Sequence, residues 1–245
     1  MNMFKNILAL IVCLAAIPSV SFAFRLTPMV IHFSPSGTKA TQVLTLENPS
    51  TEKVPIQIEV FTRTTDAKGE EVRTKTDEFN VYPEQVVLLP NEKRNVRVTW
   101  SGELKGAEEK AFRIIASQLP VEFRDRNAKP KANGVNLNFL LQYVASAYVT
   151  PEGAVAKIKV KEVKSLDKKK VRVTVANEGT AHFVLKPKSL KIYSGETLVG
   201  TVSPISELEN TNLLPKTEKT VVVNSNKEIS GNNLRGELEL AESGD

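Results

Sequence analysis

The sequence contains very little cysteine and histidine. Cys13 is the only cysteine among 245 residues, and the two histidines are His32 and His182. A structural zinc cluster needs about four Cys or His ligands, and disulfides or a papain-like Cys–His pair need cysteine within the folded domain. These sites are therefore nearly excluded. With 41% hydrophobic and 25% charged residues, the chain has the composition of a globular protein. Its length suits one large or two small domains.

Signals for catalysis are also sparse. The sequence has no Gly-x-Ser-x-Gly elbow, no P-loop and no dinucleotide-binding fingerprint. A serine triad would have to use one of the two histidines, and no spacing supports it. Pairs of acidic residues at 70–71 and 108–109 lie in expected turn or strand-entry segments. We therefore expect no enzyme activity, no cofactor, no metal and no small-molecule substrate.

Residues 1–23 have the organisation of a secretory signal peptide. Lys5 supplies positive charge, residues 7–17 form an apolar run, and Ser21 and Ala23 are small residues at the cleavage positions. The segment is too short and too poorly flanked for the alternative, an uncleaved membrane anchor. Cleavage after Ala23 would remove the only cysteine, and no later apolar run approaches about 20 residues. We expect an exported protein that core packing alone holds together.

In the rest of the chain, apolar and polar residues alternate as they do in β-strands. In residues 55–64, Ile56, Ile58 and Val60 fall on one face, and residues 95–100 repeat this pattern. Residues 66–69 form a hairpin signal. The other expected strands are 111–119, 135–149, 155–163, 171–175, 184–193, 198–202, 220–223 and 234–240. Runs at this spacing, without a helical stripe longer than two turns, predict an all-β fold of antiparallel sandwiches.

A turn-rich segment at residues 150–153 is the best domain boundary. It predicts an N-terminal domain at 24–150 and a C-terminal domain at 151–245, each suited to an Ig-like sandwich of roughly 100 residues. Residues 157–172 carry eight basic and two acidic side chains. We interpret them as a solvated hairpin, with contact to an acidic partner or a membrane surface as the alternative. No aromatic residues interleave for base stacking, so no nucleic-acid partner is expected.

Three segments of the first half occur in a familiar order. They are VVLLPNEKRNVRV at 86–98, EKAFRIIASQLP at 109–120 and LNFLLQYVASAYVTP at 137–151. Together with the signal peptide, they resemble the periplasmic chaperones of the chaperone–usher pilus pathway, the PapD-like family, and most closely its archaic branch. The resemblance implies two Ig-like domains set at an angle around a cleft. It also implies a periplasmic location, pilus or fimbrial subunits as partners and an outer-membrane usher.

In that family the chaperone lends a strand to an Ig-like subunit that lacks its last strand, a process called donor-strand complementation. The resemblance places this donor strand at the end of the first domain. Its alternating apolar residues there are Val135, Leu137, Phe139 and Leu141. The alternative is an ordinary core strand whose apolar face packs within its own domain. A polar segment at 122–134 with Pro and Gly precedes the strand, and we expect it to leave the donor region mobile.

The sequence departs from the family at the residues that anchor the subunit's terminal carboxylate. The better-known members use an arginine in the first strand and a lysine late in the donor strand, and these positions align with Val30 and Ser146. Neither side chain can pair with a carboxylate, so the anchor is absent or is built from other basic residues.

The resemblance also implies a structural glutamate between the domains, at Glu109. Its usual arginine partner aligns with Thr150, and we expect Arg97 to pair with Glu109 instead. His32 is expected to be a packed or edge residue, and His182 a turn residue.

Two other classes of protein remain open from the sequence. One is an exported two-domain Ig-like structural or adhesion module that is displayed on the cell surface. The other is a glycan-binding sandwich. Such a protein needs an exposed aromatic platform, and the chain has only one tryptophan and four tyrosines. The chaperone hypothesis differs from both because it requires an apolar strand that is available to a partner.

Overall fold

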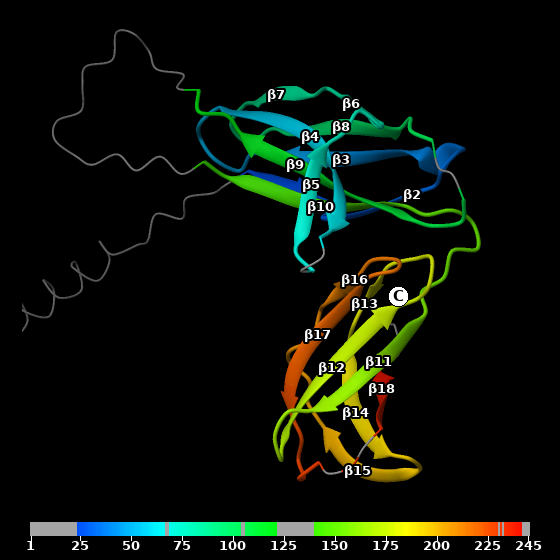
Figure 1. The fold of residues 1–245 in the computed structure, drawn as a ribbon. Coiled ribbons are helices and arrows are strands. Elements are labelled where there is room, and N and C mark those ends of the chain that lie inside the picture. Colours follow the sequence, from blue (N-terminus) through cyan, green and yellow to red (C-terminus); the bar gives the residue numbers. More distant parts are fainter. Residues whose placement is uncertain are drawn as a thin grey trace, which may run out of the picture.

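A computed structural model describes residues 24–66, 69–103, 106–121, 140–229, 231 and 233–241. It places the strands in two bodies, one above the other in Figure 1. The strands of the first body are β1 (Arg25–Thr27), β2 (Val30–Phe33), β3 (Thr41–Glu47), β4 (Val54–Thr65), β5 (Glu71–Lys75), β6 (Phe79–Tyr82), β7 (Gln85–Leu88), β8 (Lys93–Trp100), β9 (Lys110–Gln118) and β10 (Gln142–Val149). A single 3-10 turn, η1 (Thr38–Ala40), lies among the described residues of this body.

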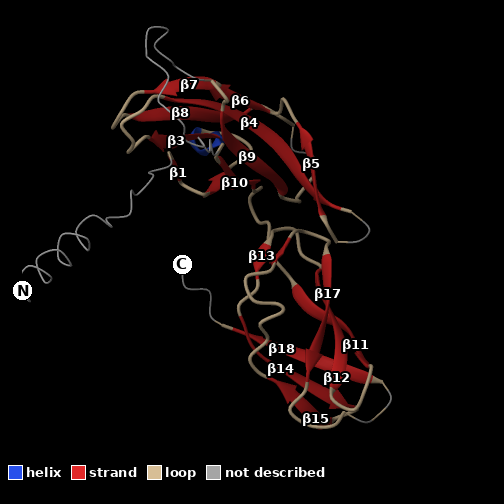
Figure 2. Cartoon of the chain, turned by 90° about the vertical axis from the view of Figure 1, so that its left-hand side faces the viewer, coloured by secondary structure: helices blue, strands red, loops and turns tan. Residues whose placement is uncertain are grey.

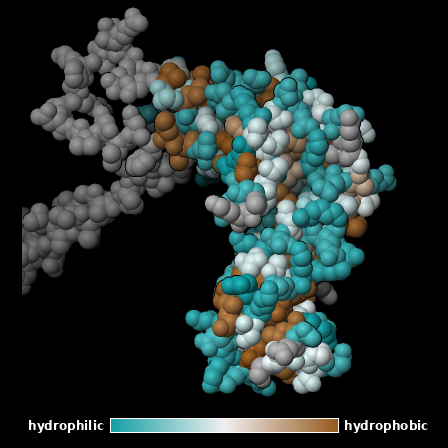
Figure 3. Space-filling model, viewed as in Figure 1, coloured by the Kyte–Doolittle hydropathy of each residue, from teal (hydrophilic) through white to brown (hydrophobic). Residues whose placement is uncertain are grey.

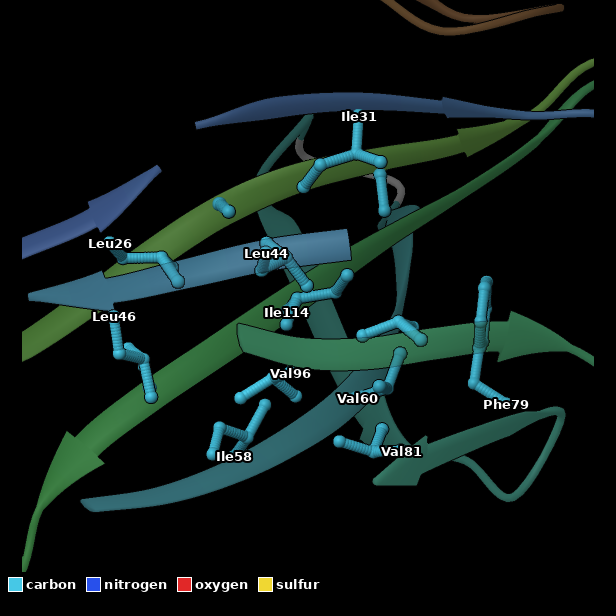
Figure 4. Packing of buried hydrophobic residues seen from close by; sticks show 14 of the residues in the cluster. Leu26, Ile31, Leu44, Leu46, Ile58, Val60, Phe79, Val81, Val96 and Ile114 are labelled. Carbon is cyan, nitrogen blue, oxygen red and sulfur yellow. The ribbon is translucent and has the colours of Figure 1, made fainter. Parts of the chain in front are cut away.

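The first body is a sandwich of two sheets. One sheet has the strand order β1-β3-β8-β6, and the other has the order β2-β10-β9-β4-β5 with β7 also paired to β4. Each strand turns alternate side chains into the space between the sheets. Ile58 and Val60 of β4 and Ile114 of β9 meet Leu44 and Val96 of the opposite sheet there (Figure 4). All five are at most 4% exposed, so the core rests on aliphatic packing.

The second body follows the same principle with shorter sheets. Its strands are β11 (Ile158–Ser165), β12 (Lys170–Asn177), β13 (Phe183–Val184), β14 (Pro187–Ser194), β15 (Thr197–Val202), β16 (Asn212–Leu213), β17 (Glu218–Asn224) and β18 (Leu234–Leu240). The sheet β11-β12-β17 packs against the sheet β15-β14-β18, with Val173, Leu190 and Ile192 fully buried between them. The short pair β13–β16 lies at the end nearest the first body (Figures 1 and 2).

The predicted all-β class is confirmed, and the two sandwiches are set at an angle to each other (Figures 1 and 2). Some predicted strands have other bounds. Residues 184–193 are not one strand but the end of β13 and most of β14, and β10 begins only at Gln142. Residues 135–139 of the expected strand 135–149 lie outside the described residues. No helix in the described part of the chain is long and apolar enough to cross a membrane.

Candidate functional site

Among the described residues, strand β10 has a partner along only part of one edge. It pairs with β9 along its whole length, but it pairs with β2 only from Ser146 to Val149. On the β2 side, the N–H of Ser146 donates to the carbonyl of Met29 at 2.9 Å. Backbone groups in a strand point to alternate edges, so those of Gln142 and Val144 point to the same side as those of Ser146. No described residue pairs with them there, so within the described part of the chain this end of the strand is an open edge.

Leu141 lies just before this open edge. Its carbonyl accepts the N–H of Gln118 at 2.8 Å, which continues the pairing of β10 with β9. By alternation its side chain shares a face with Ala145 and Ala147, which are fully buried, yet Leu141 is 37% exposed. The preceding Leu140 is 56% exposed. Apolar residues also gather at this end of the first sandwich in Figure 3. Leu141 therefore lies on the core-facing side of β10, but beyond the part of the strand that the core of the first sandwich buries.

The expected donor residues are only partly within the described chain. Leu141 is described, whereas Val135, Leu137 and Phe139 lie outside the described residues.

The positions expected for a carboxylate anchor lie side by side on the outer face of the sheet. Val30 of β2 is in register with Ser146 of β10, and Ser146 is in register with Arg113 of β9. Nη1 of Arg113 donates to Oγ of Ser146 at 2.5 Å. A guanidinium group from the neighbouring strand thus reaches Ser146, the position that aligns with the lysine of the better-known family members. Sequence reasoning missed Arg113 because only the strand register shows it.

Glu71 of β5 links three arginines on this face. Its carboxylate accepts hydrogen bonds from Arg113, from Arg63 at 2.8 Å and from Arg73 at 2.6 Å. Burial raises the pKa of Glu71, but the hydrogen bonds from Arg113 and Arg73 and the surrounding positive charge lower it to about 2. Three guanidinium groups and one carboxylate leave an excess of two positive charges. The cluster can therefore accept a further anion.

The pKa of Glu71 predicts an acid-sensitive part of the stability. The folded-state pKa is below the ordinary value of 4.5, so the stabilisation is fully present above pH 4.5 and is lost as the pH falls toward 2. Glu71→Gln should lower the free energy of unfolding at neutral pH by on the order of 1 kcal/mol, because solvent screens a partly exposed carboxylate. Urea unfolding at about pH 7 and pH 3 measures this. If Glu71→Gln lost as much stability between these pH values as the wild type does, the prediction would be contradicted.

A second cluster joins the two sandwiches around Glu109, whose side chain is 1% exposed. Oε1 accepts the backbone N–H of His182 at 3.0 Å and lies 2.6 Å from Nδ1 of the same residue. Oε2 accepts the hydroxyl of Thr150 at 2.7 Å. Burial raises the pKa of Glu109, but the hydrogen bonds from His182 and Thr150 outweigh it and lower the pKa. Glu109 is thus an ionised carboxylate between the sandwiches.

Aromatic rings extend this cluster to β10. The ring of His182 stacks on Tyr148 of β10, with centroids 3.6 Å apart and planes at 7°. His32 of β2 stacks on the same tyrosine, with ring centroids 5.5 Å apart. The Tyr148 hydroxyl accepts hydrogen bonds from Asn212 of β16 at 2.6 Å and from Arg63 at 3.1 Å. A hollow of about 330 Å³ lies next to this contact, lined by Arg63 among others. β10 is therefore in direct contact with the second sandwich.

Comparison with known protein families identifies the protein's class. The family model of the pili and flagellar-assembly chaperones, PapD N-terminal domain, matches residues 23–153. The chain belongs to this chaperone family. It is accordingly a chaperone of pilus assembly, and the PapD-like resemblance seen in the sequence is confirmed.

Solved structures share the two-domain fold of this chaperone. A chain of the CsuC–CsuE chaperone–tip adhesion subunit complex from the archaic Csu pili of Acinetobacter baumannii is 14% identical, with a TM-score of 0.60. That alignment covers 90% of this chain and 97% of the other. The class 5 fimbriae chaperone CfaA is 15% identical, with a TM-score of 0.56 and coverage of 89% and 98%. A chain of the Salmonella enterica SafA pilin–SafB chaperone complex is 15% identical, with a TM-score of 0.52 and coverage of 89% and 90%. No curated protein matches the chain by sequence.

The expected pairing of Arg97 with Glu109 is wrong for this chaperone. Val96 and Val98 of β8 take the core face, so Arg97 between them points outward and is exposed. Among the described residues, the titratable partner of Glu109 is His182. The local sequence around His182 predicts only a turn, because its partner lies 73 residues earlier in the chain. The described residues contain no group of three or more His, Cys, Asp or Glu placed to hold a metal ion.

Proposed function

We propose that this protein is a periplasmic chaperone that binds pilus or fimbrial subunits by donor-strand complementation and delivers them for assembly. The observation that carries the proposal is the open edge of β10 at Gln142 and Val144, next to the exposed side chain of Leu141. An open edge supplies the main-chain hydrogen bonds of strand addition, and alternate apolar side chains fill the partner's groove.

The proposed donor segment consists of Val135, Leu137, Phe139 and Leu141. Burying each of these side chains in a client is worth about 1.5–3 kcal/mol, or roughly 6–12 kcal/mol in total before the costs of binding and ordering. Leu141 supports the assignment because its face continues that of the buried Ala145 and Ala147. The donor side chains would then extend the chaperone's own core into the core of the client.

We further propose that Arg113 anchors the terminal carboxylate of the client. It lies beside Ser146, where the family resemblance places the anchor, and its side chain is 16% exposed. The excess positive charge around Glu71 leaves capacity for one more carboxylate. A guanidinium binds a carboxylate through two parallel hydrogen bonds, so a client terminus at this point would share Arg113 with Glu71.

The partners and location are proposed on the same basis. The structures from Csu pili and from the SafA–SafB complex are described as chaperone–subunit complexes, which supports pilus subunits as clients. The Csu likeness also favours the archaic branch. We propose cleavage after Ala23, a first domain at 24–150 and a second at 151–245. An outer-membrane usher would receive the loaded chaperone.

The experiment that tests this function is recovery of the tagged protein from the periplasm of its host during pilus expression. Mass spectrometry should find a small exported subunit in a 1:1 complex with it. An uncomplexed monomer under these conditions would contradict the chaperone proposal. Display on the cell surface instead would support the alternative, an exported Ig-like structural or adhesion module.

A further inference from the structure

The hairpin of β11 and β12 forms the end of the second sandwich that lies away from the first (Figures 1 and 2). A second segment lies against its turn. The N–H of Ser225 donates to the carbonyl of Lys169 at 2.8 Å, and the N–H of Ile229 donates to the carbonyl of Lys168 at 2.6 Å. We call residues 162–172 and 222–229 together the basic tip.

The charges of the basic tip are not balanced. It holds six basic and three acidic residues, an excess of three positive charges, and they are Lys164, Lys168, Lys169, Lys170, Arg172, Lys227, Glu162, Asp167 and Glu228. Its two ion pairs are Lys164–Glu162 at 2.7 Å and Lys168–Glu228 at 3.7 Å. Among the described residues, Lys169, Lys170 and Arg172 make no ion pair, and all three are exposed. Their charge is therefore available to an anionic partner.

Two exposed apolar side chains lie among these cations. In the strand register, Arg172 of β12 is opposite Lys164 of β11 on one side and opposite Val222 of β17 on the other. The three residues therefore share the outer face of the sheet. Val222 is 46% exposed. Leu166 in the adjoining turn donates its N–H to the carbonyl of Lys170 at 2.8 Å and is 45% exposed. The basic tip thus combines apolar surface with positive charge.

We propose that the basic tip binds the surface of an anionic lipid bilayer. Each lysine or arginine close to such a surface strengthens binding by about fivefold. An exposed leucine beside these cations inserts at the boundary between headgroups and acyl chains. A specific protein partner would need an interface of roughly 1,000 Å², which a turn with two apolar side chains supplies poorly. A bilayer requires no such matching surface, because its lipids rearrange around the side chains.

The position of the basic tip leaves the proposed client-binding edge accessible. The open edge of β10 belongs to the first sandwich, whereas the tip is at the far end of the second (Figure 1). A chaperone held by the tip therefore keeps this edge away from the lipid. Membrane binding does not depend on the donor-strand assignment, so either proposal can fail without the other.

Flotation with lipid vesicles tests the proposal without a client. The purified chaperone is mixed with phosphatidylethanolamine vesicles that contain about a quarter phosphatidylglycerol, or with vesicles of phosphatidylcholine alone. At about 50 mM salt, the partition coefficient should be at least about tenfold higher for the anionic vesicles. It should fall about tenfold at about 0.5 M salt, because salt screens the attraction between exposed charges.

Lys170→Gln combined with Arg172→Gln is the decisive variant. At about fivefold for each cation, its partition coefficient for anionic vesicles should fall about 25-fold. The matched control is Arg25→Gln combined with Lys39→Gln, which removes the same charge from exposed positions of the first sandwich. The control should stay within about threefold of the wild type. Thermal unfolding checks that both variants are folded.

Leu166→Ser tests the apolar part of the contact. Its partition coefficient should fall about fivefold while the salt dependence stays that of the wild type. Equal partition of the wild type into both kinds of vesicle, or equal losses in the two double variants, overturns the proposal. Binding to polyglutamate without binding to anionic vesicles overturns it in favour of an acidic protein partner.

Discussion

Leu141→Asp is expected to abolish client binding while the chaperone stays folded. The side chain is 37% exposed in the free protein, so an aspartate there remains hydrated. In the client's groove the same change removes about 1.5–3 kcal/mol of apolar burial and also buries a charge. The affinity should fall at least about a hundredfold. Surface plasmon resonance with the subunit recovered from the periplasm measures binding, and thermal unfolding checks the fold.

Leu198→Asp is the matched control for this change. Leu198 is 50% exposed on β15 of the second sandwich, so the chemical change and the exposure are similar but the location is not. Binding by this variant should stay within about threefold of the wild type. Phe139→Asp, in the proposed donor segment, should behave like Leu141→Asp. Normal binding by both Leu141→Asp and Phe139→Asp would show that the donor strand is assigned wrongly.

Arg113→Gln is expected to weaken client binding about tenfold to a hundredfold, which corresponds to the loss of hydrogen bonds between charged groups. The reason is the position of its guanidinium beside Ser146, where we propose that the client's terminal carboxylate binds. Titration calorimetry with the recovered subunit measures the affinity. A client whose C-terminus is amidated should bind wild type and Arg113→Gln equally, because the carboxylate contact is then missing in both cases.

Arg73→Gln controls for the loss of positive charge. Arg73 also donates to Glu71, at 2.6 Å, but it lies on β5 and is 39% exposed. Its loss should change the affinity by less than about threefold, as expected for an exposed ion pair. Equal losses of client affinity in Arg73→Gln and Arg113→Gln would mean that the cluster attracts clients by its overall charge. The specific carboxylate anchor would then be refuted.

The fold was largely predictable because the face of a strand is set by local alternation. Ile56, Ile58 and Val60 of β4 all point into the core as their spacing predicts. Short strands were harder to predict. β16 has only two residues, which is too short for a pattern of alternation to show. They form a strand only because β13 lies opposite them. Pro187, by contrast, begins a new strand inside the segment 184–193, which the sequence predicts as one strand.

The candidate site was less predictable, because its contacts join residues far apart in the chain. Arg113 reaches Ser146 across 33 residues, and that contact depends on the register of β9 with β10. Glu109 meets His182 across 73 residues, and that contact depends on how the two sandwiches meet. Neither depends on a local pattern. The sequence did indicate Leu141, since apolar alternation next to a polar segment is a local feature.

The most direct test of the account is photo-cross-linking from the proposed donor segment in the living periplasm. A benzophenone amino acid placed at Leu141 should cross-link to one pilus subunit during pilus expression, and mass spectrometry should map the link to the groove of that subunit. The same probe at Leu198 should give no such product. Subunit cross-links from Leu198 but none from Leu141 would show that clients bind elsewhere, and the donor-strand account would be wrong.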